Sequence, residues 1–422
     1  MKLVKSLVLG SAAAFVGMTG AQAADLPGAE PVEYVKVCDA YGAGFFYIPG
    51  TDTCLLIGGL VRGDYSVGEV VRTIGGGSSK PANNTGFRAR ARLWFDARTE
   101  TEYGTVRTYI RAQFQRDSGN QSGSTAATAV GGDDSVFDKA FVQFAGLTAG
   151  LTDSFWDFKP YPTFTNPFIS DRTLAVLAYT ADFGGGFSAS IGIEDGTARR
   201  TTATGGAGGP GFADYREQKY PDIVGNLRVK QGWGEAQLSG FAHHITTEEI
   251  SRDSDWGYGV QLGAKVDLPF LGKGDFLWAS AAYSSGALSY LGLGSGSGDY
   301  AFVVSGTQNI LNANRLVDFE VGPGGKIRKT EAYAFNLGVL HYWSPKWRSA
   351  LQGTYVDANV KTFGQNNDFS GYGITTNIIW TPVKKLDIGA EINYVKVEDK
   401  SAVYNLRDDD AFVGRFRVQR DF

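Results

Sequence analysis

Long hydrophobic runs are missing from most of this chain of 422 residues. Apart from an apolar run at residues 7–18, which is too short to span a membrane, no stretch approaches the roughly 18 uninterrupted apolar residues of a membrane-spanning helix. The sequence therefore shows no helical membrane anchor. If this protein enters a membrane, we expect it to do so as β-strands.

The chain has no excess of positive charge, since 40 Lys and Arg residues face 44 Asp and Glu residues. This balance gives no reason to expect a nucleic acid partner. The glycine-rich segments 75–78 and 205–211 lack the Lys-Ser/Thr ending and the strand-to-helix context of a phosphate-binding loop. We therefore interpret both segments as flexible loops.

Histidine is rare, with three residues, of which His243 and His244 are adjacent. Adjacent side chains of a strand point to opposite faces, so this pair is a poor start for a metal site. All three histidines lie in predicted strands, which leaves a membrane-embedded hydrolase with a Ser/His pair as a minor alternative. We expect no cofactor, no metal site and no catalytic residues.

The chain is rich in glycine and aromatic residues, with 57 Gly, 20 Tyr and 27 Phe. This composition favours β structure with many turns. Segments in which apolar and polar residues alternate recur about sixteen times from residue 54 to the end. They cover residues 54–66, 86–98, 103–116, 136–145, 147–153, 173–183, 186–195, 221–231, 234–246, 256–268, 274–285, 331–343, 347–358, 370–381, 386–398 and 409–422.

The connections between these segments alternate in length. Short turns such as 99–102 and 344–346 alternate with long polar loops such as 117–135 and 286–330. This asymmetry is typical of transmembrane β-barrels, whereas a solenoid or a propeller would show a recurring motif. Length alone leaves two soluble domains as reasonable as one barrel. The alternation favours an all-β fold, namely a membrane-spanning, antiparallel, up-and-down β-barrel of about 16 strands.

Segment 86–98 indicates what the two faces of such a barrel would contain. One face of this strand carries Phe87, Leu93 and Phe95 together with alanines, and the other carries four arginines and Asp96. A soluble β-sandwich would have to bury these arginines, which is costly unless each is paired. A water-filled barrel interior accommodates them better.

The last strand, 411–422, repeats this pattern, with Phe412 and Phe416 on the lipid side and two arginines on the lumen side. In a closed barrel the last strand pairs with the first, which brings eight arginines onto four adjacent strands. We predict that the pore-lining basic wall consists of Arg62, Arg88, Arg90, Arg92, Arg107, Arg111, Arg415 and Arg417.

Residues 153–172 are the best candidate for an acidic element opposite this wall. The segment is too aromatic for a freely solvated loop, so we expect it to fold back into the lumen and to pack Phe155, Trp156 and Phe158. Facing groups of opposite charge would bias the passage of ions. A loop packed on the outer rim is the alternative. The carboxylates that we expect to face the arginines are Asp153, Asp157 and Asp171.

The N-terminus reads as a secretory signal peptide, because two lysines, an apolar run and the small-residue sequence Ala21-Gln22-Ala23 follow one another. In an exported chain, Cys38 and Cys54 are expected to form a disulfide, with a reactive thiol pair as the alternative. The predicted organisation is a signal peptide at 1–23, an N-terminal segment tied by the disulfide at 24–53, and a barrel at 54–422.

Several of these segments resemble the alphaproteobacterial porin family. The stretch VEYVKVCDAYGAGFFYIPGTDTCL at 32–55 is the most specific, and PDIVGNLRVKQGWG at 221–234 and the ending GRFRVQRDF are similar to family segments. The resemblance implies a sixteen-stranded outer-membrane barrel, usually a homotrimer, whose third loop enters the lumen as a constriction. The segment SFWDF at 154–158 stands where the family begins that loop. Phe422 resembles the C-terminal aromatic signal that the outer-membrane assembly machinery reads.

These observations predict a general porin in the cell outer membrane, in contact with outer-membrane lipid and lipopolysaccharide. Such a protein is a passive, water-filled channel for small hydrophilic solutes and ions, and it needs no catalysis. A channel specific for one class of solute is the first alternative. A surface adhesin without a pore is a second and less favoured one.

Overall fold

The computed structural model describes residues 36–68, 84–121, 130–201, 215–247, 254–293, 317–322, 325–362, 365–366, 368–400 and 409–422. The predicted signal peptide and the two glycine-rich segments at 75–78 and 205–211 lie outside these residues. None of the helices in the described ranges is both long and apolar enough to cross a membrane.

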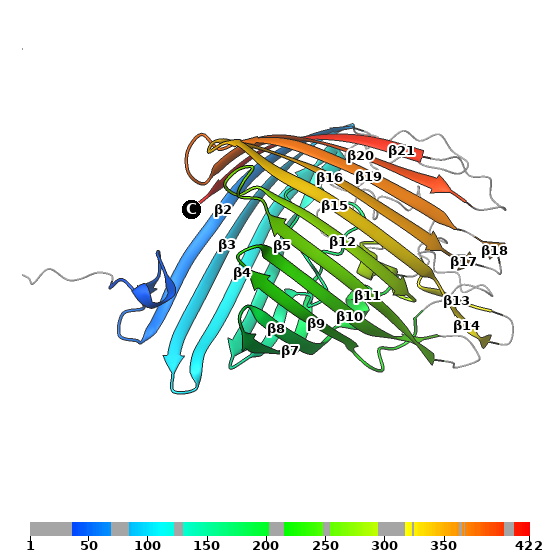
Figure 1. Ribbon diagram of the computed structural model, residues 1–422, viewed down its shortest axis with the longest axis horizontal. Helices are drawn as coiled ribbons and strands as arrows, with labels where there is room; N and C mark the ends of the chain where they lie inside the picture. The colour runs from blue at the N-terminus through cyan, green and yellow to red at the C-terminus, as the bar shows by residue number, and fades with distance from the viewer. Residues whose placement is uncertain are drawn as a thin grey trace, which may run out of the picture.

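Within the described part of the chain, sixteen antiparallel strands close into a β-barrel (Figure 1). Each strand pairs with its neighbours in the chain, and the first and last strands pair with each other. The barrel strands are β2 (Thr53–Gly68), β3 (Thr85–Thr101), β4 (Gly104–Ser118), β5 (Val130–Phe144), β6 (Leu147–Asp153), β7 (Thr173–Gly184), β8 (Phe187–Glu194), β9 (Asp222–Gln231), β10 (Gly234–Thr246), β11 (Ser254–Asp267), β12 (Phe276–Ser285), β15 (Glu331–Ser344), β16 (Trp347–Asn359), β19 (Phe369–Trp380), β20 (Leu386–Asp399) and β21 (Asp409–Asp421).

Every segment predicted from the alternating pattern corresponds to one of these strands. The largest difference is in β5, which begins at Val130 rather than at residue 136. The alternation also predicted the faces correctly, because the outward side chains of Phe87, Ile191 and Leu262 each leave more than half of their surface exposed. A continuous exposed apolar band of this kind is expected where a barrel faces lipid.

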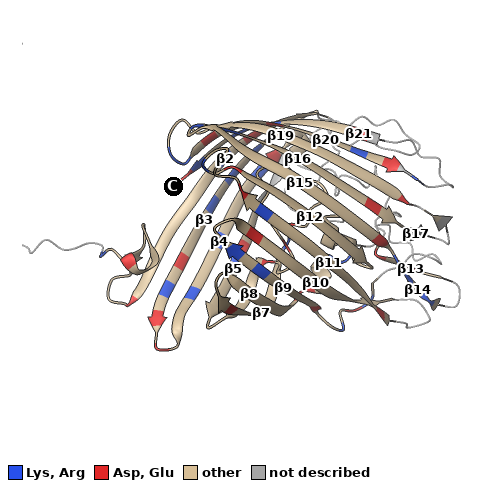
Figure 2. Cartoon of the chain, in the orientation of Figure 1, with Lys and Arg blue, Asp and Glu red and all other residues tan. Residues whose placement is uncertain are grey.

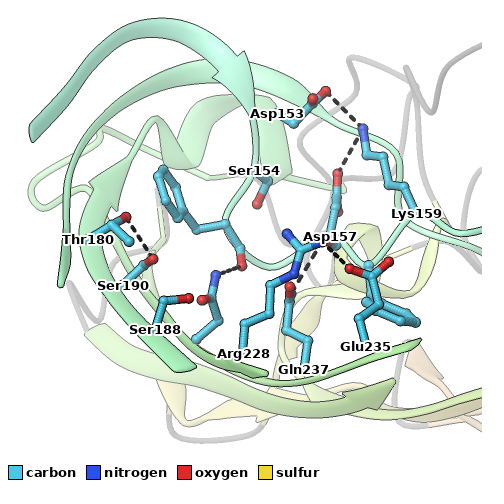
Figure 3. Close-up of a pocket in the computed structure, with 13 residues that line it drawn as sticks. Asp153, Ser154, Asp157, Lys159, Thr180, Ser188, Ser190, Arg228, Glu235 and Gln237 are labelled. Atoms are coloured by element: carbon cyan, nitrogen blue, oxygen red, sulfur yellow. Dashed lines mark hydrogen bonds and ion pairs between the residues drawn. The ribbon is translucent and has the colours of Figure 1, made fainter. Parts of the chain in front are cut away.

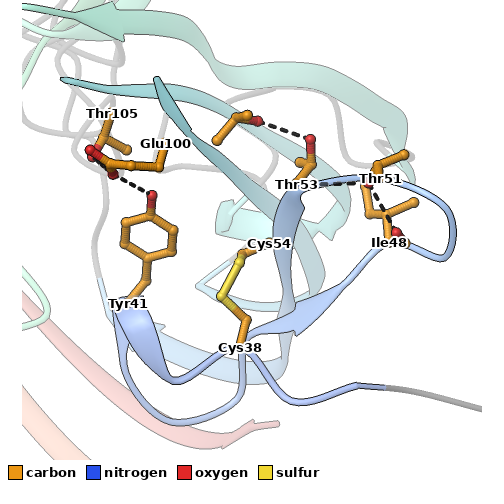
Figure 4. Close-up of a disulfide and its surroundings, with 9 residues drawn as sticks. Cys38, Tyr41, Ile48, Thr51, Thr53, Cys54, Glu100 and Thr105 are labelled. Atoms are coloured by element: carbon orange, nitrogen blue, oxygen red, sulfur yellow. Dashed lines mark hydrogen bonds between the residues drawn. A yellow bond between two sulfur atoms is a disulfide. The ribbon is translucent and has the colours of Figure 1, made fainter. Parts of the chain in front are cut away.

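The N-terminal segment lies at the end of the barrel that carries the short turns (Figures 1 and 4). Cys38 and Cys54 form a disulfide, with their Cα atoms 6.0 Å apart. It connects the short helix η1 (Asp39–Tyr41) to the start of β2, which also pairs with strand β1 (Phe46–Tyr47). Tyr41 OH donates a hydrogen bond of 3.0 Å to Glu100 on β3. The disulfide therefore fastens this segment to the barrel wall.

The opposite end of the barrel carries the long loops. A buried apolar cluster joins described residues of these loops to the barrel strands and the loop after β6, and it includes Phe168, Leu288, Val317 and Phe369. The short elements in these loops are η2 (Gly119–Gln121), η3 (Gly196–Arg199), η4 (Leu288–Leu291), β13 (Phe319–Val321), β14 (Ile327–Lys329), β17 (Lys361–Thr362) and β18 (Gln365–Asn366).

A buried chain of hydrogen bonds ties two long loops to the barrel. Asp318, from the loop after β12, accepts hydrogen bonds from Tyr215 OH at 2.8 Å and from the amide of Thr201 at 2.6 Å, both in the loop before β9. Tyr215 OH also lies 2.9 Å from His243 Nε2, and His243 Nδ1 lies 2.7 Å from Asp222. Burial raises the pKa of the Asp318 carboxyl to about 6. His243 is thus a structural residue that joins two strands to two loops.

Candidate functional site in the barrel lumen

The loop between β6 and β7, residues 154–172, lies inside the barrel, as the sequence predicted. Its two ends are held together by a hydrogen bond of 2.9 Å from the Ser154 amide to the Arg172 carbonyl. Trp156 is completely buried, donates through Nε1 to the carbonyl of Tyr290 at 2.8 Å, and meets the ring of Phe241 edge-on at 5.1 Å. The loop is therefore anchored to the lumen side of the wall rather than to the outer rim.

The far part of this loop crosses to the other side of the lumen. Thr163 lies 2.9 Å from the Gln352 side chain on β16, and the Phe164 amide donates to Glu391 on β20 at 2.5 Å. A Cβ atom on Gly371 of β19 would come within 2.6 Å of the Phe168 ring. The glycine at this position makes room for the loop, so the lumen surface of the strands is shaped to receive it.

The eight predicted arginines lie on β21, β2, β3 and β4, which are adjacent in the sheet. We refer to these eight residues as the arginine wall. On β3, Arg88 makes a bidentate pair with Asp117 at 2.8 and 2.9 Å, Arg90 donates to Gln115 at 2.7 Å, and Arg92 donates to the next glutamine of β4, Gln113, at 2.6 Å. Cross-strand hydrogen bonds therefore fix the guanidinium groups in place.

The wall is less basic than the sequence suggested, because carboxylates are built into it. Arg417 makes a bidentate pair with Asp64 at 2.7 and 2.9 Å, and Arg107 pairs with Asp96 at 3.0 Å. Blue and red bands alternate along β3 in Figure 2. These pairs cannot be read from the sequence, since each depends on the register between neighbouring strands. The carboxylates that pair with the wall are Asp64, Asp96, Asp117 and Asp138.

The pair between Asp138 and Arg111 could not be predicted from the alternating pattern. The pairing of β4 with β5 shifts between Arg111 and Ala112, so that Asp138 has no partner residue in the ladder. Such a β-bulge breaks the alternation of faces. Asp138 consequently pairs with Arg111 and lies 3.7 Å from Arg92. A strict alternation of faces would place only one of the neighbours Asp138 and Lys139 on the lumen side, whereas Asp138 pairs with Arg111 and Lys139 pairs with Asp153.

Arg415 differs from the other members of the wall. Its side chain is buried, and its three guanidinium nitrogens have no hydrogen-bond partner among the described residues. It stands directly opposite Glu391 on the neighbouring strand, without forming an ion pair within the described part of the chain. Arg415 therefore contributes positive charge that no adjacent carboxylate cancels through direct contact.

In the described part of the chain, the ion pairs of the predicted constriction carboxylates are with Lys139, Lys159 and Arg199. Asp157 is almost completely buried within the loop, where it accepts hydrogen bonds from Ser170 Oγ at 2.6 Å and from the Arg172 amide at 2.7 Å. Arg199 lies 3.7 Å away from it. The loop uses this carboxylate to hold its own two arms together, because buried charges require partners close by.

Asp153 and Asp171 are partly exposed, but they pair with lysines. Asp153 binds both Lys139 and Lys159, and Asp171 binds Lys159. Burial opposes the charge of Lys159, but the carboxylates of Asp157, Asp171 and Asp153 outweigh this effect and raise its pKa. Lys159 is therefore held as an ammonium, and the loop carries cations among its acids.

The described residues contain no group of three or more His, Cys, Asp and Glu side chains that could hold a metal ion. His244 meets the rings of Tyr220 and Trp256 edge-on, and His341 is 2.5 Å from Asp275. Charged side chains on two sides of a water-accessible lumen are suited to orienting polar solutes and sorting ions.

Comparisons with known proteins agree with this arrangement. The Porin subfamily matches residues 26–415 of the chain. Porin Omp2b of Brucella suis biovar 1 (strain 1330) is 31% identical over 432 residues, which is 99% of each chain. Porin Omp2b of Brucella abortus (strain 2308) is 30% identical with the same coverage.

Solved structures show the same fold at lower sequence identity. The outer membrane channel DcaP of Acinetobacter baumannii matches with a TM-score of 0.66 and 19% identity, covering 89% of this chain and 99% of that one. An anion-selective porin from Comamonas acidovorans matches with a TM-score of 0.51 and 11% identity, covering 88% and 100%. The family match explains the apolar outer band, the charged lumen and the inner loop. The chain belongs to the porin family and is an outer-membrane β-barrel that forms a channel for the diffusion of small solutes.

Proposed function

We propose that the arginine wall and the loop at 154–172 set the selectivity of a general diffusion channel. The observation that carries this proposal is the balance of charges in the lumen. In the described part of the chain, four carboxylates pair with members of the eight-residue arginine wall, whereas the acids of the loop are matched by lysines and arginines. The lumen therefore has a positive side and a nearly neutral side, and it favours small anions.

A planar lipid bilayer under a salt gradient tests this proposal. We expect discrete conductance steps on insertion and a reversal potential on the anion side. A reversal potential on the cation side would contradict the role of the wall, and folded protein that gives no steps would favour a surface protein without a pore. Transport that saturates, with competition between solutes, would favour the solute-specific alternative.

Catalysis has no part in the function that we propose. In a passive channel, the diameter of the lumen and its electrostatic field determine the flux, and no bond is made or broken. The three histidines support this view, because each has a structural partner in a strand or a loop. Hydrolysis of ester substrates by the purified protein, lost on substitution of His243, would contradict it.

We further propose three parts for the whole chain: a signal peptide at 1–23, the disulfide-tied segment at 24–53 and the barrel at 54–422. The charged start, apolar run and small-residue site at Ala23 support cleavage at that position. N-terminal sequencing of the protein from outer membranes should begin at Ala24. A start downstream of Cys38 would contradict the proposed boundary.

We also propose that the protein assembles as a homotrimer in contact with outer-membrane lipid and lipopolysaccharide. Membership of the porin family supports this assembly. Phe422 is proposed to be read by the outer-membrane assembly machinery, since over half of the surface of this aromatic residue is exposed. Chemical cross-linking in membranes should yield three-chain products, and deletion of Phe422 should slow assembly in cells.

A further inference from the structure

A recess of about 380 Å³ opens beside the inner loop, where β7, β8, β9 and β10 form the wall (Figure 3). This volume lies at the lower end of the range found for pockets that hold small molecules, about 300–1,000 Å³. No residue of the arginine wall lines the recess. It is therefore a separate feature of the lumen, with its own chemistry.

Hydroxyl and amide groups cover the wall of this recess in two neighbouring rows. Thr180, Ser190 and Asn226 lie directly opposite one another on β7, β8 and β9. Ser188 and Gln237 belong to the next row, on β8 and β10. Because adjacent strands are about 4.8 Å apart, each row presents a polar group at about that interval. Thr180 and Ser190 share a hydrogen bond of 2.8 Å, and the amide nitrogens of Asn226 and Gln237 donate to the inner loop. The hydroxyl and amide oxygens can still accept hydrogen bonds, and the Ser188 hydroxyl can also donate one, so the rows can match a solute with many hydroxyls.

The charged groups of the recess are already paired with one another. Arg228 forms an ion pair with Glu235, and Lys159 binds Asp153 and lies 3.4 Å from Asp157. Figure 3 shows Lys159 between the two aspartates. An ionic solute would have to displace one of these partners, which would leave a charge unpaired in a half-enclosed site. A neutral solute meets no such cost.

Two aromatic residues of the inner loop complete the recess. Phe155 and Phe158 line it, and Asn226 Nδ2 donates a hydrogen bond of 2.7 Å to the carbonyl of Phe155, which fixes the loop against β9. The C–H faces of a sugar ring are apolar, and a pocket with aromatic side chains and a few placed polar groups suits such a ligand. We propose that this recess is a binding subsite for a neutral, polyhydroxylated solute of the size of a mono- or disaccharide.

This proposal rests on the channel function given above, and ion current through single channels tests both. Glucose and maltose serve as neutral probes, and gluconate serves as a charged probe of similar size. We expect the current to fall along a saturating curve with either neutral sugar and in proportion to solution viscosity with gluconate. The Thr180→Val, Ser188→Ala, Ser190→Ala variant should raise the half-saturating sugar concentration at least about threefold, as the loss of one hydrogen bond would.

The matched control is Thr148→Val on β6, which changes a hydroxyl of the barrel wall outside the recess. It should bind maltose as the unchanged protein does. If the triple variant fails to assemble, Ser188→Ala alone replaces it, because the Ser188 hydroxyl has no hydrogen-bond partner in the described ranges. A linear fall of current with maltose in the unchanged protein, or tighter binding of gluconate than of glucose, would overturn the subsite. Absence of conductance steps would instead overturn the channel itself.

Discussion

The guanidinium carbon of Arg417 lies 4.2 Å from the centre of the Phe164 ring. The inner loop therefore meets the arginine wall through the face of an aromatic ring and not through a carboxylate. A cation can interact favourably with such a ring while it keeps its own ion pair, and Arg417 does keep its bidentate pair with Asp64. The loop touches the wall at this point without cancelling its charge.

Arg415→Gln should make the channel less selective for anions. The substitution removes a positive charge from the lumen side of β21, and no described carboxylate loses an ion pair, since Arg415 forms none. We expect the reversal potential in a salt gradient to move towards the cation side. Arg420→Gln is the control, because Arg420 donates to the carbonyl of Lys384 at the short-turn end. Equal shifts of the reversal potential in the two variants would contradict the idea that the charge of Arg415 acts from its position in the lumen.

Asp171→Asn and Asp157→Asn should have different effects, although the two residues belong to one loop. Asp171 is partly exposed, so its neutralisation should move the reversal potential towards the anion side. Asp157 is buried and accepts hydrogen bonds from Ser170 and Arg172, so its substitution should loosen the loop by about 1–3 kcal/mol. Noise in the open-channel current should increase in the second variant only. An equally quiet Asp157→Asn channel would argue against the anchoring role.

Trp156→Ala should release the inner loop from the wall. The side chain is completely buried against Phe241 and Tyr290, and truncation of such a residue costs about 3–5 kcal/mol. We expect a larger single-channel conductance and faster cleavage of the loop by added protease. Trp343→Ala is the control, since Trp343 is mostly exposed on the barrel exterior. The prediction fails if conductance and cleavage remain those of the unchanged protein.

The hydrogen bonds that Asp318 accepts from the loop before β9 should stabilise the two loops less as pH rises. Burial raises the pKa of this carboxyl from its ordinary value of 3.8 to about 6, so the closed loops bind a proton more tightly than opened loops do. The stabilisation of the closed loops by the protonated carboxyl is complete below pH 3.8 and is lost as pH rises through about 6. Hydrogen exchange of the Thr201 and Leu288 amides, corrected for intrinsic rates, should show about tenfold greater protection at pH 5 than at pH 8.

Asp318→Asn provides the control for this prediction. The amide cannot ionise, so the dependence of protection on pH should disappear, although overall protection should fall because the Thr201 amide and Tyr215 hydroxyl lose a full acceptor. Persistence of the same pH dependence in this variant would assign it to another group.

Cys38→Ser with Cys54→Ser should free the N-terminal segment and leave the pore unchanged. The disulfide closes a loop with a sequence separation of 16, and a bond of this kind contributes about 3 kcal/mol. We expect faster proteolysis of the segment around Tyr41 and an unaltered conductance, because the disulfide lies outside the lumen at the short-turn end. A changed conductance would show that the segment reaches the pore.

The barrel was predictable from the sequence because one physical rule operates on every strand. Lipid outside and water inside force apolar and polar residues to alternate, and this pattern can be read without knowing any contact. The position of the arginines on adjacent strands followed from the closure of the sheet. The inner loop was predictable for a similar reason, since Trp156 and Phe158 could not remain in water.

The partners of the charged residues were not predictable in the same way. Whether Asp64 meets Arg417 depends on the exact register between β2 and β21, and Asp138 enters the lumen only because a bulge interrupts β5. The burial of Asp157 depends on Arg199, which comes from a different loop. Such pairs are decided by three-dimensional contacts that no local pattern records.

The seam between β2 and β21 determines when the barrel can be completed. The hydrogen bond from Arg62 to Gln419 joins residues 357 positions apart, and Phe422 pairs with Gly59. The barrel can therefore close only when β21 is available to pair with β2. Until then, the apolar faces of the earlier strands must be kept from water. A slip of one residue at the seam would turn Arg417 towards lipid and separate it from Asp64, so a barrel closed in the wrong register would carry the cost of two unpaired charges.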